Sequence, residues 1–174
     1  GLPYSESANG LGKLIMKLTE KFRIDSHEQA QRKSFVAFAH DDAALLREML
    51  PIMEKNVGQI IERFYAHLLS YAEAQAFFRD ENTLNRAKAA QREYVLDLFR
   101  DTYGEDYFEK RLRIGVTHER IGLVPKWYIG SFSNFICLII PLLAAKYRFR
   151  PEKLNRCIMA VIKIMNLDQQ LAID

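Results

Sequence analysis

The chain has 174 residues, a length that suits one domain with a sizeable core. Hydrophobic residues make up 49% and charged residues 27%, the mix of an ordinary soluble globular protein. A net charge of +3, with no run of Lys or Arg, excludes the broad basic face that a nucleic-acid partner requires.

Apolar residues recur at helical spacing along the whole chain, and no alternating strand pattern is evident. An amphipathic piece is expected over residues 11–22, followed by a polar link over 23–34 with some helical character. Residues 40–72 predict two helical pieces, with a break or kink at Pro51. A turn-rich segment over 73–82 follows.

The second half continues the helical pattern. Helices are expected over 83–101 and over 107–122, separated by the turn "TYGED". Pro125 suits the first turn of a helix that runs to about Tyr147, with a kink at Pro141, and Pro151 begins the last helix. The total of about seven or eight helices predicts an all-α domain.

The two cysteines, Cys137 and Cys157, lie in apolar surroundings without the spacing of a zinc site or of c-type haem attachment. They are interpreted as buried thiols in a reducing compartment. The stretch "FICLIIPLLAA" is far shorter than the ~20 residues of a membrane span, and the polar N-terminus lacks a secretory signal. We therefore expect a cytoplasmic protein with no membrane partner.

The last two helices carry more apolar surface than one core needs. The stretch "FSNFICLIIPLLAAKY" is apolar nearly all round, and the final helix has two apolar stripes, which must both be buried. We expect the second face to pack on another copy of the chain about a two-fold axis; the alternative buries both helices inside a monomer. The stripes are Leu154, Ile158, Val161 and Met165, and Cys157, Ile164, Leu167 and Leu171.

Of the four histidines, His118 stands out because it lies on the apolar face of its helix. Gly115 precedes it and Gly122 follows it at about one turn. Glycine costs helix stability, so this pair suggests that something bulky and flat approaches the imidazole.

Several roles are open for this histidine. A neutral core histidine bonded to a carbonyl is the commonest case. A catalytic base lacks a nucleophile or a second polar group, and a zinc site lacks further ligands at suitable spacing. A metal that brings most of its own ligands, such as haem iron held by one imidazole, agrees best with the glycines and the nearby aromatic residues.

The stretch "THERIGLVPKWYIGSF" resembles the proximal signature of globin-coupled sensors, the protoglobin-like haem-binding sensor domains of bacterial signalling proteins. "ERFYAHLL" resembles the family's Phe-Tyr helix, and "IMNLDQQLAID" resembles the end of its last helix, before an output domain. The resemblance covers the chain from about Asp41 onward. It implies a globin-like sandwich with an extra N-terminal helix: an N-terminal extension over 1–39 and a sensor globin domain over 40–174.

The same resemblance implies roles for individual residues. His118 matches the proximal ligand of a non-covalent haem b, and Tyr128 is placed to be its hydrogen-bond partner. Tyr65 matches the distal tyrosine, whose hydroxyl would donate to O₂. His67 lies about 200° around the helix from Tyr65 and is expected at the surface. The other residues expected to contact the cofactor are Phe77, Ala87, Ala90, Gln91 and Trp127.

Two of these residues depart from the family's pattern. Where Ala87 and Ala90 fall, the family tends to have a Leu or a Thr. The alanines widen the pocket and remove a polar partner for O₂, which leaves Tyr65, Gln91 or a water as its donor.

The implied function is that of a haem-based O₂ sensor domain, which could also bind CO or NO. The domain is not expected to be an enzyme itself. Its signal would pass through a homodimer of the last two helices to a C-terminal output domain absent from this chain. The alternatives are a stand-alone protoglobin-like haem protein that stores O₂ or acts on it, and a haem-free helical dimerisation module.

Overall fold

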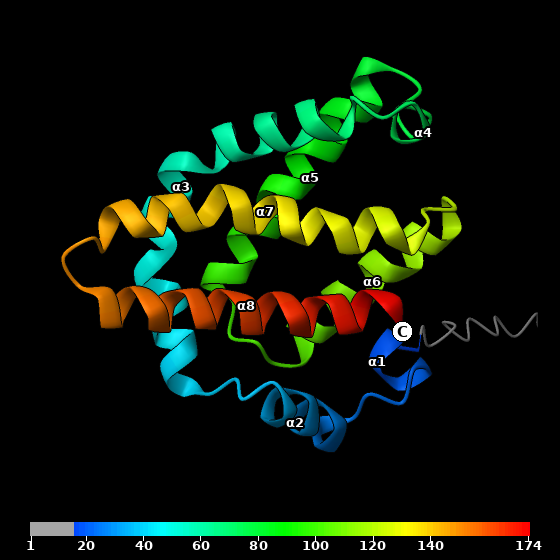
Figure 1. The fold of residues 1–174 in the computed structure, drawn as a ribbon. Coiled ribbons are helices and arrows are strands. Elements are labelled where there is room, and N and C mark those ends of the chain that lie inside the picture. The colour runs from blue at the N-terminus through cyan, green and yellow to red at the C-terminus, as the bar shows by residue number, and fades with distance from the viewer. Residues whose placement is uncertain (1–15) are drawn as a thin grey trace, which may run out of the picture.

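The computed structural model describes residues 16–174, which form helices joined by short links (Figure 1). No strand occurs in this range, and the predicted all-α class is confirmed. Of the amphipathic piece expected over 11–22, residues 11–15 lie outside the described residues, and the remainder contains the short helix α1. The helices are α1 (Leu18–Lys21), α2 (Ser26–Phe35), α3 (His40–Leu68), α4 (Ala72–Gln75), α5 (Glu81–Arg100), α6 (Glu105–Arg120), α7 (Pro125–Lys146) and α8 (Pro151–Ile173).

The helix ends follow from local chemistry. The side chains of Asp25 and Asp80 each accept a hydrogen bond from the backbone N–H three residues on, at 2.9 and 2.7 Å, and so cap α2 and α5. Pro125 and Pro151 occupy the first turns of α7 and α8, where a missing N–H costs nothing. These boundaries are close to those that the sequence predicts.

Pro51 lies inside one continuous helix, α3. The expected kink is visible as a change of direction along α3 in Figure 1, whereas the alternative of a break into two helices is wrong. Tertiary packing explains the continuity, since apolar side chains on both sides of Pro51 are buried: Leu46, Met49, Met53 and Val57.

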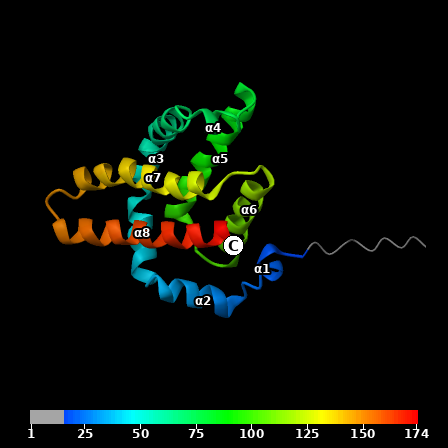
Figure 2. The ribbon, with the colours of Figure 1, turned by 45° about the vertical axis from the view of Figure 1, so that its right-hand side comes forward.

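Helices α7 and α8 run antiparallel, side by side, and α3 and α5 cross behind them (Figures 1 and 2). Helix α6 packs against the C-terminal half of α8. The core lies between these helices and is rich in aromatic side chains, including Phe99, Tyr103, Tyr107 and Phe108. Residues far apart in the sequence therefore meet where α5, α6, α7 and α8 converge.

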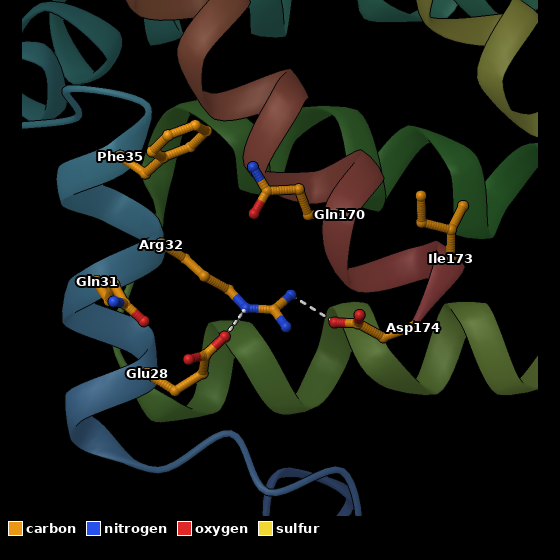
Figure 3. A pocket seen from close by; sticks show the side chains of 7 residues that line it. All are labelled: Glu28, Gln31, Arg32, Phe35, Gln170, Ile173 and Asp174. Atoms are coloured by element: carbon orange, nitrogen blue, oxygen red, sulfur yellow. Dashed lines mark hydrogen bonds and ion pairs between the residues drawn. The ribbon is translucent and has the colours of Figure 1, made fainter.

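Helix α2 is held against the end of α8 by charge (Figure 3). The guanidinium of Arg32 lies between Glu28, at 2.7 Å, and Asp174, with which it also forms an ion pair. Glu109 on α6 accepts hydrogen bonds from the backbone N–H groups of Leu18 and Thr19, both at 3.0 Å, at the start of α1. These contacts attach α1 and α2 to α6 and α8.

The apolar stripes of α8 are arranged differently from the expectation. Six of their eight residues are buried within one chain, and only Leu154 and Ile158 are half-buried. The second stripe is thus covered by α3, α6 and α7 rather than reserved for a second copy. Cys157 is buried as expected, but Cys137 is exposed on α7, so that prediction is wrong for one thiol.

Helix α7 is the most apolar helix and yet is poorly covered. Among the described residues, it is the one helix long and apolar enough to span a membrane, and 22% of its apolar window is buried. One stripe enters the core: Phe132, Phe135, Ile139 and Leu143. An opposite stripe is open: Ile129, Ser133, Cys137, Pro141 and Ala145.

Candidate functional site

His118 lies in the last turn of α6, half-buried, with its imidazole beside the ring of Tyr128 on α7 (centroids 4.9 Å apart). Its Nδ1 atom is buried and has no hydrogen-bond partner in the described part of the chain. Desolvation lowers the pKa of His118, so the neutral ring, with a free lone pair, is favoured. A core histidine would be hydrogen-bonded, and this one is not.

The imidazole and Tyr65 on α3 are joined by an aromatic layer. Tyr128 packs against Phe132 (5.1 Å between centroids), and one turn further along α7 Phe135 stacks on Phe64 at 4.3 Å. Phe64 in turn meets the ring of Tyr65 edge-on, at 5.2 Å. The two residues expected on either side of the cofactor therefore border one apolar region.

Tyr65 is buried, and its hydroxyl makes no hydrogen bond to the rest of residues 16–174. Phe78 meets its ring edge-on at 5.7 Å, and the Lys88 ammonium on α5 lies 6.0 Å from the ring centroid. Burial raises the pKa of Tyr65 to about 12, so the phenol keeps its proton and stays a donor at neutral pH.

The remaining expected residues occupy a range of environments. Ala87 and Gln91 are half-buried on α5, and Ala87 packs on the core, whereas Ala90 is exposed. Phe77 is half-buried in the link before α5. Contact of these side chains with a cofactor stays a prediction.

Trp127 turns towards the end of α3, where its ring meets Tyr71 at 5.3 Å. A surface groove here is lined also by His67, Ser131 and Asn134. His67 is exposed and faces Tyr71 (5.5 Å), which confirms the prediction that it lies at the surface. The expected contact of Trp127 with a cofactor stays a prediction.

The two glycines near His118 have separate structural roles. A Cβ on Gly115 would lie 2.6 Å from the carbonyl oxygen of Ala172, so this glycine lets α6 and α8 touch backbone to backbone. Gly122 has φ of +72° and ends α6, a backbone conformation that favours glycine. For Gly115, the interpretation from sequence is corrected, because the space beside it is filled by the backbone of α8.

Gly115→Ala is expected to destabilise the protein by about 1–3 kcal/mol, because the methyl group must push two backbones apart. Gly58→Ala on α3 is the matched control: nothing lies within 4 Å of its Cβ, and alanine favours a helix, so stability should rise slightly. Urea denaturation of both variants measures the difference. Equal stabilities would contradict the close α6–α8 contact.

A buried polar cluster lies beside Tyr128. The carboxylate of Asp168 on α8 is fully buried and accepts hydrogen bonds from the hydroxyls of Tyr94, at 2.6 Å, and Tyr107. The Tyr94 and Tyr128 hydroxyl oxygens are 3.2 Å apart. We call Tyr94, Tyr107, Arg111, Tyr128 and Asp168 the tyrosine–aspartate cluster; it joins α5, α6, α7 and α8.

Arg111 supplies the positive charge of this cluster. Its Nε lies 3.3 Å from Asp168, and its guanidinium packs over the rings of Tyr94 (4.0 Å) and Tyr107 (4.7 Å). It also donates to the Tyr94 carbonyl oxygen, at 3.3 Å. Burial by itself lowers the pKa of Arg111, but the Asp168 carboxylate outweighs this effect, so the pKa is raised and the guanidinium stays charged. Burial raises the pKa of Asp168, although the charge of Arg111 acts to lower it.

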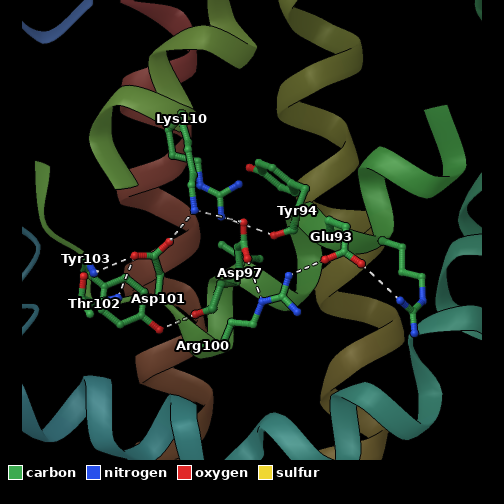
Figure 4. A network of polar contacts seen from close by, with 11 residues as sticks. Glu93, Tyr94, Asp97, Arg100, Asp101, Thr102, Tyr103 and Lys110 are labelled. Atoms are coloured by element: carbon green, nitrogen blue, oxygen red, sulfur yellow. Dashed lines mark hydrogen bonds and ion pairs between the residues drawn. The ribbon is translucent and has the colours of Figure 1, made fainter. Parts of the chain in front are cut away.

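The ion pairs next to the tyrosine–aspartate cluster are more exposed than the Arg111–Asp168 pair. Arg100 bridges Glu93 and Asp97, and Lys110 reaches Asp101 at the corner between α5 and α6 (Figure 4). Such surface pairs contribute little to stability. The sequence analysis missed the cluster, although one signal was available: Asp168 is a lone acid among the apolar positions of the last helix.

The donor set around His118 is that of a metal which brings most of its own ligands. Within residues 16–174, no group of three His, Cys, Asp or Glu side chains could hold a metal ion. A single neutral imidazole with an unpartnered nitrogen, beside an aromatic layer, agrees with haem and disagrees with zinc.

Comparisons with known proteins agree with this geometry. The Protoglobin family model matches residues 25–174. The heme-based aerotactic transducer HemAT of Halobacterium salinarum is 30% identical over 166 residues, which cover 90% of this chain and 34% of that protein. The chain thus spans about a third of the length of this relative.

Among solved structures, the globin domain of the Geobacter sulfurreducens globin-coupled sensor aligns with a TM-score of 0.78. The alignment covers 82% of this chain and 93% of that one, at 23% identity. It confirms the predicted globin-like arrangement of helices.

Proposed function

The chain belongs to the protoglobin family, and from this we propose that it is a haem-binding domain that senses O₂. One observation carries the proposal: a buried imidazole nitrogen without a partner, on His118, in surroundings that favour the neutral ring. Haem, when bound, supplies an iron that takes one protein nitrogen and binds a diatomic gas reversibly. A non-covalent haem of b type is proposed, since no cysteine pair has c-type spacing.

The chain's own residues hold the cofactor and select the gas. His118 supplies the ligand nitrogen, and Tyr128 keeps the ring in place. Phe77, Phe78, Ala87 and Gln91 supply the apolar and amide surface near Tyr65. The Tyr65 phenol is the proposed donor to O₂, because it is buried, protonated and without another partner among the described residues.

Tyr65→Phe is expected to weaken O₂ binding about ten- to a hundredfold, since a hydrogen bond to a charged acceptor is worth roughly 1.5–3 kcal/mol. CO carries less negative charge and should lose less affinity. Equilibrium titration with both gases measures the ratio. Tyr71→Phe, which changes an exposed tyrosine just beyond α3, serves as the control. Equal losses for O₂ and CO would remove Tyr65 from its proposed role.

The proposed signalling form is a homodimer through α7 and α8. The open stripe of α7 supports this, together with exposed Met159 and Ile162 on the neighbouring helix α8, because exposed apolar side chains gathered on adjacent helices are typical of interfaces. The surface differs from the α8 stripes that the sequence suggested, most of which are buried in the monomer. A cytoplasmic location is supported by the two free thiols.

Cys137→Arg should convert the dimer to a monomer, because it places a charge at the centre of the open α7 stripe. Light scattering after size exclusion gives the mass. Phe35→Arg, at another exposed apolar residue, on α2, should stay dimeric. A dimer in both variants would count against this interface.

The full-length protein is proposed to carry an output domain beyond α8, with the globin domain itself not acting as an enzyme. The transducer relative, of which this chain spans about a third, supports that arrangement. A small shift at the proximal side would change the relative stability of two dimer states, and α8 would pass it on.

A further inference from the structure

The tyrosine–aspartate cluster is costly for a purely structural contact. Burying a charge pair carries a desolvation penalty that well-packed apolar residues avoid. Asp168 and Arg111 are 0% and 2% exposed, so both ions are fully removed from water. Helices α6 and α8 already have a close contact at Gly115 and Ala172. The cluster therefore does something that packing alone does not.

The hydrogen bonds of the cluster have a fixed direction. The ionised carboxylate of Asp168 can only accept hydrogen bonds, so the Tyr94 hydroxyl donates its hydrogen bond to Asp168. The Tyr94 oxygen then accepts from the hydroxyl of Tyr128, 3.2 Å away. The Tyr128 oxygen keeps a lone pair that is not used in the hydrogen bond to Tyr94. The Tyr128 ring itself lies against the imidazole of His118.

We propose that Asp168 is a positioning residue for His118. Through Tyr94, it fixes the orientation of the Tyr128 hydroxyl and the position of the Tyr128 ring against the imidazole. Because Asp168 lies on α8, it also attaches α8 to these side chains. The inference rests on the proposed function, because it takes His118 to be the haem ligand. It gives α8 a direct polar connection to the proximal side, in addition to its apolar packing.

The charge centre of the cluster lies on α8 itself, whereas His118 and Tyr128 lie on α6 and α7. A movement of the Tyr128 ring therefore acts on a carboxylate that accepts hydrogen bonds from two tyrosine hydroxyls and forms an ion pair with the Arg111 guanidinium. Buried hydrogen bonds of this kind are strengthened by the low local dielectric, and they couple the helices that they join. The shift is thus transmitted to α8 rather than absorbed by side-chain rotation.

The test uses Tyr94→Phe and Asp168→Asn. Tyr94→Phe removes one hydroxyl and keeps the Arg111–Asp168 pair, so it should fold even if Asp168→Asn does not. The absorption spectrum first establishes haem uptake. Resonance Raman of the reduced protein then reads the iron–histidine stretch, which should shift because the Tyr128 ring that packs against the imidazole loses its hydrogen bond to Tyr94.

A second measurement needs no haem. Hydrogen exchange over residues 113–120 should be faster in haem-free Tyr94→Phe than in the haem-free wild type, because the Tyr128 ring loses its anchor. Asp42→Asn is the matched control: Asp42 is also a buried acid that holds α8, through Lys163 at 3.2 Å, but it belongs to α3 and makes no contact with the tyrosine–aspartate cluster through this pair. It should leave both measurements unchanged.

An unshifted iron–histidine band in haem-loaded Tyr94→Phe, or an equal shift in Asp42→Asn, overturns the inference while leaving the proposed function intact. A wild-type protein without a Soret band after haem supplementation overturns the proposed function, and this inference with it. The absorption spectrum separates these two failures before any variant is made.

Discussion

His118→Ala is expected to purify without a Soret band and to lose more than about a hundredfold in haem affinity. The imidazole is the one protein ligand proposed for the iron, and even the partners of such ligands contribute roughly ten- to a hundredfold. The other three histidines, His27, His40 and His67, are exposed at the surface. Absorption spectra of the haem-supplemented protein measure the loss.

His67→Ala is the control, since this exposed histidine faces Tyr71 at the surface and should bind haem as the wild type does. His118→Gly with added imidazole should regain the band, because the free ligand can enter the vacated space. Circular dichroism checks that α6 is still folded. A normal Soret band in His118→Ala would show that the ligand is another residue.

Arg111→Met is expected to destabilise the protein by about 3–5 kcal/mol, the largest stability effect that we expect for a single substitution. It leaves the Asp168 carboxylate buried without its countercharge, and breaking a buried pair from one side costs this much. Denaturant unfolding of the haem-free protein measures the change. Arg100→Met, which breaks pairs at the exposed α5 surface, should change stability far less.

The pH dependence of the Arg111→Met variant has a definite sign. Burial already raises the pKa of Asp168 in the folded state, and loss of Arg111 raises it further above that of the unfolded chain. The folded state then binds more protons than the unfolded state, so the variant becomes more stable as the pH falls from neutral towards the unfolded pKa, about 4. Adding Asp168→Leu should recover part of the stability. A loss that persists unchanged in the double variant would contradict the buried-charge explanation.

The helices and their order were predictable because hydrophobic periodicity, prolines and capping residues are local signals. The helix begun by Pro125, the helix begun by Pro151 and the helix that carries His118 lie close to where the sequence places them. Pro51 was ambiguous, since a proline weakens a helix locally but cannot show whether packing on both sides will hold it together.

Interpretations that needed the neighbours of a residue were less secure. The glycines at 115 and 122 suggested room for a flat group, but one meets a backbone carbonyl of α8 and the other adopts a positive φ. The stripes of α8 suggested a second copy, yet most of both is buried within one chain. Periodicity shows that a face is apolar and does not show what covers it.

The all-α class, the series of helices and the histidine most suited to bind haem could be predicted from local patterns in the sequence. The tertiary structure was needed to show that Arg111, Asp168 and the tyrosine at 94 meet beside Tyr128, since these residues come from separate helices and up to 74 positions separate a bonded pair. It also decided which stripe of α7 is left open. Helix formation depends on residues a few positions apart, whereas these contacts depend on how whole helices cross.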